Sequence, residues 1–181
     1  MDFKKDFPIF KNNNEKYPLI YFDNASTTQK PQCVINSISH FYSHYNANVH
    51  RGNYKIAEKA TLEFENSRQT IANFINAEKD EIIFTNGTTE SINLIAYSFV
   101  SLLKDEDEII ISEMEHHSNI LPWEMIKEKK NIKIKYITVN EKGQLDLNQL
   151  ESLINKKTKL CSIISMSNIL GTIIDLNKIS K

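Results

Sequence analysis

Short apolar runs alternate with stretches of helical periodicity along most of this chain, and this order constrains its fold more than any other feature. We expect buried strands at the apolar runs 82–84, 109–111 and 160–166, and a strand at 132–139, where apolar and polar residues alternate. Between them, apolar residues recur every three or four residues, which is the spacing of a helix with one buried face. Strands that alternate with helices predict an α/β fold with a mainly parallel sheet and helices on both faces.

The first 80 residues carry fewer strand signals. The brief apolar run Leu19–Phe22 predicts a strand, and helical spacing predicts helices over Val34–Tyr45 and Ile56–Ile75. Met1–Phe10 mixes phenylalanines with charged residues, which fits an amphipathic arm.

Composition excludes several classes of protein. The 181 residues include 22 basic and 23 acidic side chains, so we expect neither a nucleic-acid partner nor an acidic membrane surface. No apolar run reaches membrane-spanning length, and Met1–Phe10 carries charges where a signal peptide would be apolar, so we expect a cytoplasmic protein. Cys33 and Cys161 form neither a disulfide framework nor a metal pattern, and we expect both to be packed rather than reactive.

The stretch Ile82–Asn93 reads as a strand, a small polar turn and the start of a helix. Gly87 permits a tight turn, and Thr88 and Thr89 place hydroxyl groups where the helix begins. A helix N-terminus presents unpaired N–H groups and the positive end of the helix dipole, which suits a phosphate. An ordinary helix cap explains the same residues, and this stretch alone does not decide between the two.

Polar turns follow three of the predicted strands, after Phe84, Ile111 and Met166. In parallel α/β sheets, ligands bind beyond the carboxyl ends of the strands. These turns are therefore expected to border one site.

Five motifs, read together in order, carry a family resemblance. They are Asp23-Asn24-Ala25-Ser26-Thr27-Thr28, Asn48-Val49-His50-Arg51-Gly52, Thr85 to Asn93, Met114-Glu115-His116-His117-Ser118-Asn119-Ile120 with Pro122-Trp123, and Ser167-Asn168-Ile169-Leu170-Gly171-Thr172. The chain resembles the N-terminal part of the SufS-type (group II) cysteine desulfurases, which are pyridoxal 5'-phosphate (PLP) enzymes of the class V aminotransferase family. The resemblance implies the PLP-dependent transferase fold of type I, with residues 1–20 as an arm and residues 21–181 as the first part of the large PLP-binding domain, incomplete at its C-terminus.

The resemblance also implies residue roles around the cofactor. Thr88 and Thr89 match the residues that hold the cofactor phosphate, and His116 matches the catalytic histidine that stacks on the pyridine ring. Asn168 matches the asparagine near the phenolic oxygen of the cofactor. Without the resemblance, His116 would read as a surface or packing histidine and Asn168 as a turn residue.

Four further residues match the substrate side of the family's site. His50 and Arg51 match a loop at the mouth of the site, partly contributed across a dimer interface, and Asn24 and Ala25 match a turn beside the substrate. No metal site is expected, because the sequence has no HExxH or CxxC pattern.

The activity that the resemblance implies is desulfuration of L-cysteine to L-alanine, with sulfur passed through an enzyme persulfide to iron–sulfur cluster assembly. It implies a homodimer and a sulfur-acceptor protein of the SufE type. A selenocysteine lyase, another class V carbon–sulfur lyase and a catalytically inactive fragment are the alternatives.

The covalent machinery of the family has no match in this sequence. The Schiff-base lysine, the aspartate that pairs with the pyridine nitrogen and the persulfide cysteine all lie downstream of the Ser167–Thr172 motif in the family. Lys178 and Lys181 have the wrong context for the lysine, and Cys33 and Cys161 do not match the cysteine. We therefore expect this chain to contain part of the cofactor pocket and none of the residues that form covalent bonds.

This expectation is testable on the purified 181-residue chain. After incubation with PLP and reduction with borohydride, mass spectrometry should find no stoichiometric lysine adduct. The chain should also release no sulfide from L-cysteine. Robust turnover by the chain alone would contradict the assignment.

Overall fold

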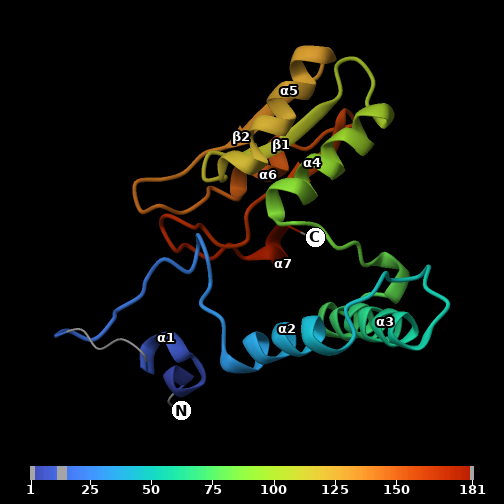
Figure 1. Cartoon of the computed structure of the whole chain (residues 1–181). Coiled ribbons are helices and arrows are strands. Elements are labelled where there is room, and N and C mark those ends of the chain that lie inside the picture. The colour runs from blue at the N-terminus through green and yellow to red at the C-terminus, as the bar shows by residue number, and fades with distance from the viewer. Residues whose placement is uncertain (1–2, 12–15, 180–181) are drawn as a thin grey trace. The chain divides into compact units, whose positions relative to one another are not determined.

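The computed structural model describes residues 3–11 and 16–179 (Figure 1). The chain divides into two compact units, Met1–Ile83 and Phe84–Lys181, and each is described by itself. The expected arm lies partly outside the described residues, and the predicted domain limit at residue 20 stays a prediction.

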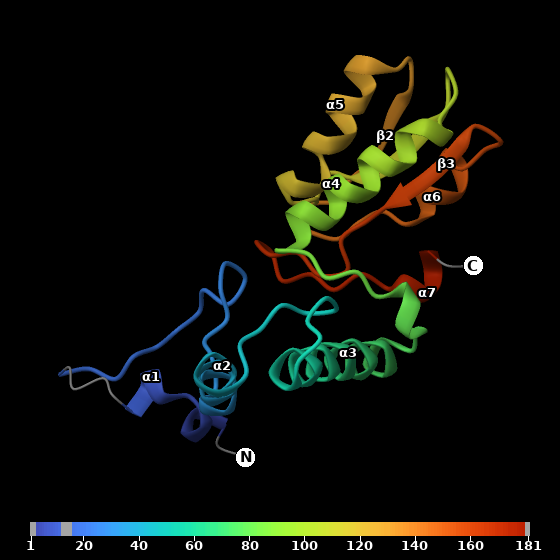
Figure 2. The same ribbon diagram turned by 45° about the vertical axis from the view of Figure 1, so that its right-hand side comes forward.

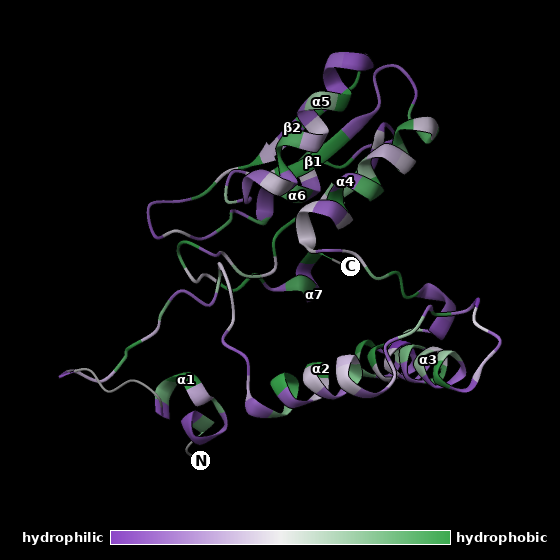
Figure 3. Ribbon diagram, in the orientation of Figure 1, coloured by the Kyte–Doolittle hydropathy of each residue, from purple (hydrophilic) through white to green (hydrophobic). Residues whose placement is uncertain are grey.

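The first unit is helical. It contains the short helices η1 (Phe3–Asp6) and α1 (Pro8–Lys11), the long helices α2 (Gln32–His44) and α3 (Lys55–Ile75), and η2 (Lys79–Glu81). Both long helices were predicted, and hydrophobic and hydrophilic residues alternate along them (Figure 3).

Small residues allow close packing at the start of α3. Ala57 and Ala60 are buried there, and a Cβ atom on Gly52 would lie 2.1 Å from the Cβ atom of Ala57. The chain just before α3 therefore needs glycine for its close approach to the helix, not for an unusual φ angle.

The second unit contains the sheet. Its elements are α4 (Thr88–Phe99), η3 (Val100–Leu102), β1 (Glu108–Ser112), η4 (His117–Asn119), α5 (Leu121–Lys129), β2 (Lys133–Ile137), α6 (Asn148–Leu153), β3 (Thr158–Ser162) and α7 (Leu176–Ile179). The three strands are parallel and lie in the order β2-β1-β3, so β1 is central. The predicted parallel α/β arrangement is confirmed.

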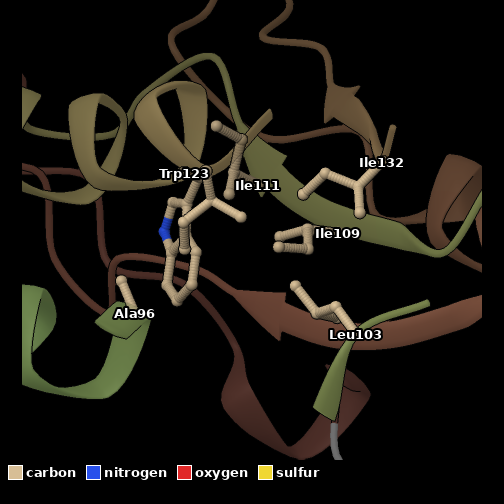
Figure 4. Close-up of a cluster of buried hydrophobic side chains, with 7 residues drawn as sticks. Ala96, Leu103, Ile109, Ile111, Trp123 and Ile132 are labelled. Atoms are coloured by element: carbon tan, nitrogen blue, oxygen red, sulfur yellow. The ribbon is translucent and has the colours of Figure 1, made fainter. Parts of the chain in front are cut away.

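Strand β1 separates two hydrophobic cores. Ile109 and Ile111 face the core shared with α4 and α5, where Trp123 is only 1% exposed (Figure 4). Ile110 faces the other core, where it packs with Ile137 and with Leu150 of α6. Helices therefore cover both faces of the sheet, which is why every residue of β1 is buried.

Two predicted strands are wrong. Leu19–Phe22 and Ile82–Phe84 are irregular, and Phe22 and Ile83 are 92% and 70% exposed. A strand needs a neighbour for its backbone hydrogen bonds, and the described residues provide none beside either run. An apolar run signals burial or pairing, but the sequence alone does not reveal whether a partner strand exists.

The prediction that both cysteines are packed is also wrong, because Cys33 and Cys161 are both exposed. Cys161 lies on β3, which is an edge strand of the described sheet. Partial burial of the thiol and the nearby Glu115 carboxylate still raise the pKa of Cys161.

Because β1 is central, we expect truncation of one of its buried side chains to lower the free energy of unfolding strongly. Ile110→Ala should lower the free energy of unfolding by about 2–5 kcal/mol, because the side chain is fully buried and leaves a cavity. Ile95→Ala on α4, where the side chain is 52% exposed, is the matched control and should change it by less than about 0.5 kcal/mol. Denaturant unfolding measures both variants, and equal losses would contradict the described core.

Candidate functional site

The turn before α4 has a backbone that favours glycine. Gly87 has φ 152° and ψ 177°, a region rarely open to other residues, and no atom lies within 4 Å of the position that a Cβ would take. The Thr85 and Ser91 hydroxyl groups bond to each other at 2.7 Å across the turn. Glu90 reaches back and accepts the Asn86 backbone N–H at 2.6 Å.

These contacts leave the first turn of α4 open to an anion. The first backbone bond into the helix is donated by Ser91 to the Gly87 carbonyl, at 3.1 Å. Among the described residues, the N–H groups of Gly87, Thr88 and Thr89 have no hydrogen-bond acceptor. Both threonine side chains are exposed, so their hydroxyl groups and the unpaired N–H groups of the first turn are accessible to a ligand.

His116 lies in the loop that follows β1 and caps η4. Its Nδ1 accepts the Ser118 backbone N–H at 3.1 Å, so a neutral ring carries its proton on Nε2. The Ser118 hydroxyl also lies 2.8 Å from Nδ1. The imidazole is exposed, with one nitrogen fixed by the protein and the other available to a ligand.

Asn168 lies in a compact turn beyond β3. The turn is built on Ser167, which is only 4% exposed and whose hydroxyl accepts the backbone N–H groups of Ile169 and Leu170. The Gly171 N–H closes the turn on the Ser167 carbonyl at 3.0 Å. Asn168 is exposed, which leaves its amide free to contact a ligand.

These features share one edge of the sheet. The start of α4 lies near the end of β1 in Figure 1 and near the tip of β3 in Figure 2, and η4 packs against α4. Among the described residues no hydrogen bond links Thr88, Thr89, His116 and Asn168 to one another. The start of α4 and the loops that carry His116 and Asn168 therefore follow or adjoin the carboxyl ends of the strands, without a direct hydrogen bond between the four residues.

Sequence reasoning missed the polar residues beneath this edge. Glu115 and Asn119 are 8% and 7% exposed and are hydrogen-bonded to each other. Apart from their position on either side of His116, these two residues carry no signal in the sequence. Their burial depends on neighbours that are distant in the sequence.

Asn24 and Ala25 lie in a turn of the first unit. The Asp23 carbonyl accepts the backbone N–H groups of Ser26 and Thr27, both at 3.1 Å, and the Ser26 hydroxyl donates to the Asp23 carboxylate at 2.8 Å. Both Asn24 and Ala25 are exposed.

His50 and Arg51 lie in the turn before α3. His50 has a left-handed backbone with φ 70°, its N–H donates to the Thr61 hydroxyl at 2.9 Å, and its Nε2 lies 2.8 Å from the Glu65 carboxylate. These contacts hold the His50 ring against α3, whereas Arg51 is exposed.

Glu65 is the electrostatic centre of that turn. The Lys79 ammonium at 2.8 Å, helped by His50 and Arg68, lowers the pKa of Glu65 from 4.5 to about 2. The carboxylate therefore stays charged well below its usual range.

Comparison with known proteins identifies the family. The model of the class V aminotransferases matches residues 20–181. The chain belongs to this family. It is 46% identical over 182 residues to the cysteine desulfurase SufS of Plasmodium falciparum and 48% identical over 181 residues to a probable cysteine desulfurase of Borreliella burgdorferi. Each match covers 98% of this chain but only 33% and 43% of the relatives, so the chain spans less than half their length.

Solved structures agree. A cysteine desulfurase from Thermococcus onnurineus NA1 matches with a TM-score of 0.89 and 37% identity, over 97% of this chain and 42% of that protein. The cysteine desulfurase CsdA of Escherichia coli matches with a TM-score of 0.82 and 34% identity, over 97% and 43%. The predicted PLP-dependent transferase fold is confirmed, and enzymes of this family depend on PLP.

Two further observations concern the described part of the chain. No helix in it is long and apolar enough to cross a membrane. No group of three or more histidine, cysteine or acidic side chains in the described ranges is placed to hold a metal ion.

The low pKa of Glu65 predicts a pH dependence of stability. A carboxylate with a depressed pKa stabilises the folded chain above the ordinary value near 4.5, and this stabilisation disappears as the pH falls toward 2. The melting temperature of Glu65→Gln should therefore lie below that of the unsubstituted chain at pH 6, and the difference should shrink as the pH falls from 4.5 toward 2.

Glu63→Gln on the same helix is the matched control, because no ion pair involves Glu63 in the described part of the chain. Added salt should reduce the effect of Glu65→Gln, since the ion pairs are exposed. A difference between Glu65→Gln and the unsubstituted chain that stays constant from pH 6 to 3 would contradict this account.

Proposed function

We propose that this chain forms the phosphate-binding and ring-stacking side of the PLP pocket of a cysteine desulfurase. The observation that carries the proposal is the open N-terminus of α4, with Gly87, Thr88 and Thr89 presenting N–H donors at the edge where β1 and β3 end. The relatives named as cysteine desulfurases support the choice of reaction.

Each site residue is proposed to take the role that its match to the family implies, and its surroundings are compatible with that role. Thr88 and Thr89 bind the phosphate through hydroxyl and backbone donors. His116 would hold the cofactor ring with its exposed imidazole and could exchange a proton with the substrate through Nε2, while the Ser118 N–H occupies Nδ1. Asn168 donates its amide hydrogen to an anionic oxygen of the cofactor. When bound, PLP would supply an electron sink for loss of the substrate Cα proton.

The proposed reaction converts L-cysteine to L-alanine and transfers the sulfur to the thiol of an enzyme cysteine, which becomes a persulfide. This sulfur is then used for iron–sulfur cluster assembly. Neither Cys33 nor Cys161 is assigned that role. We propose a cytoplasmic homodimer that hands sulfur to a SufE-type acceptor. Support for the reaction comes from the relative named cysteine desulfurase SufS, which this chain matches at 46% identity over part of its length.

We propose substrate-side roles for four residues of the first unit, because these residues match the substrate side of the family's site. Asn24 and Ala25 form a tight exposed turn, which suits contact with a small polar substrate. Arg51 offers an exposed cation for a carboxylate, and the His50–Glu65 contact holds the turn that carries it. Residues 21–181 are proposed as the first part of one large PLP-binding domain, preceded by an arm at residues 1–20.

Removing a hydroxyl donor tests the phosphate site. Thr89→Ala should weaken PLP binding roughly tenfold or more, because a hydrogen bond to a charged group contributes about 1.5–3 kcal/mol. Ser98→Ala, at the far end of the same helix, removes another exposed hydroxyl and should leave the affinity unchanged. The measurement is an absorbance titration of the whole protein that contains this chain. Equal affinities of the two variants would remove the phosphate assignment.

Truncating His116 tests the catalytic role. In the same protein, His116→Ala should lower turnover by about 100-fold or more, as expected for loss of a group that transfers a proton. Loss of its cap on η4 should lower the free energy of unfolding by only about 1 kcal/mol. His117→Ala is the control in the same loop. Unchanged turnover in His116→Ala would remove the assignment.

A further inference from the structure

Two buried polar residues flank the exposed turn that carries His116. Glu115 precedes it and Asn119 ends it, and the Asn119 amide donates to the Glu115 carboxylate at 2.8 Å. The Asn119 backbone N–H also donates to the His116 carbonyl at 2.8 Å. Two hydrogen bonds therefore close the turn, one between its backbone groups and one between the side chains of Glu115 and Asn119.

The Glu115 carboxylate connects two strands of the sheet. One oxygen accepts the hydroxyl of Ser112, the last residue of β1, and also the backbone N–H of Ile164 at 2.8 Å. Ile164 lies just beyond β3, in the segment that leads to Asn168. The Glu115 side chain thus joins the loop of His116 to the segment between β3 and Asn168.

The Asn119 amide makes a second set of connections. Its oxygen accepts the Ser162 hydroxyl at 2.7 Å and the Trp123 indole N–H at 3.0 Å, and its nitrogen donates to the Ser162 carbonyl at 3.2 Å. Ser162 ends β3 and Trp123 lies in α5. We call Ser112, Glu115, Asn119, Trp123 and Ser162 the clamp.

A buried carboxylate is costly to keep for stability alone. Glu115 forms no ion pair among the described residues, so hydrogen bonds alone compensate for its removal from water. Apolar side chains of similar volume often stabilise a fold equally well, whereas a fully bonded polar network fixes one geometry. The described part of the chain leaves no buried polar side-chain atom without a partner.

We propose that Glu115 and Asn119 are positioning residues that set the place of the His116 imidazole relative to the segment carrying Asn168. The proposal rests on the proposed function. The clamp links the last residue of β1 to the last residue of β3, where the two loops leave the sheet. It would therefore fix the distance between His116 and the segment of Asn168, which the proposed function assigns to one ligand. Such pre-organisation matters because small misplacements of catalytic groups greatly slow a reaction.

Exchanging the two side-chain types tests the clamp. One oxygen of the Glu115 carboxylate accepts from the Asn119 amide and the other from the Ile164 backbone N–H. In Glu115→Gln, the new NH2 group must therefore face one of these two donors, whichever way the amide is oriented. In Asn119→Asp, two carboxylates face each other. In the double variant E115Q/N119D, the new amide at position 115 can donate to the new carboxylate at position 119, and the net charge is unchanged. The new carboxylate also faces the Ser162 carbonyl, which accepts from the amide of Asn119 in the unsubstituted chain. The double variant should therefore recover part of what each single variant loses.

Three readouts on the whole protein separate the possible causes. Trp123 is the single tryptophan of this chain, so its indole N–H resonance in the assigned NMR spectrum reports directly on the clamp. Nitrogen-15 shifts of His116 report which ring nitrogen carries the proton. Turnover of L-cysteine reports the reaction, and His117→Gln in the same turn is the control.

Each single variant should shift the Trp123 indole resonance, convert His116 from one tautomer to a mixture and lower kcat by roughly tenfold to a hundredfold. E115Q/N119D should reverse part of all three changes, and the control should change none. The inference is overturned if the indole resonance shifts while the His116 ring and kcat match the control, or if the resonance does not shift at all.

Two safeguards keep the result decisive. If a single variant fails to fold, Ser112→Ala, which removes one donor from Glu115, should give the same changes at smaller size, and no change would overturn the inference. If the unsubstituted protein turns over no L-cysteine, the proposed function fails, and the imidazole shifts alone decide the role of the clamp.

Discussion

The burial of β1 on both faces is the constraint on which the second unit depends. Ile109 and Ile111 fill one core and Ile110 fills the other, so helices must cover both sides. Parallel pairing with β2 and β3 then brings the carboxyl ends of all three strands to one edge. The polar loops follow the strands to this edge, and α4 begins beside it, which is where ligands bind in such sheets.

The site joins two kinds of structure. The first turn of α4 follows the glycine turn and presents backbone N–H donors that suit an anion. The clamp is made of buried side chains that bond to one another behind the exposed loops. The first unit uses a similar principle, since Glu65 holds the His50 turn through ion pairs and hydrogen bonds. In both places exposed polar groups are held by residues that lie behind them.

Much of this could be predicted from residue spacing, because the helices α2 to α5 and the three strands follow local periodicity. Ile82–Phe84 and Leu19–Phe22 failed as strands, since an apolar run does not reveal whether a partner strand exists. Glu115 and Asn119 were missed for a related reason. Asn119 bonds to Ser162, 43 residues away, and the sequence does not show such contacts. The proposed site residues Thr88, Thr89, His116 and Asn168 came only from reading several motifs together, and their roles stay predictions.

The central claim is that the first turn of α4 holds the phosphate of PLP. An NMR titration of the 181-residue chain with PLP, following assigned backbone amides, tests it most directly. The account predicts that the largest shifts fall on the N–H groups of Gly87, Thr88 and Thr89, and that inorganic phosphate competes for them. Saturable binding that leaves these three amides unchanged would contradict the account.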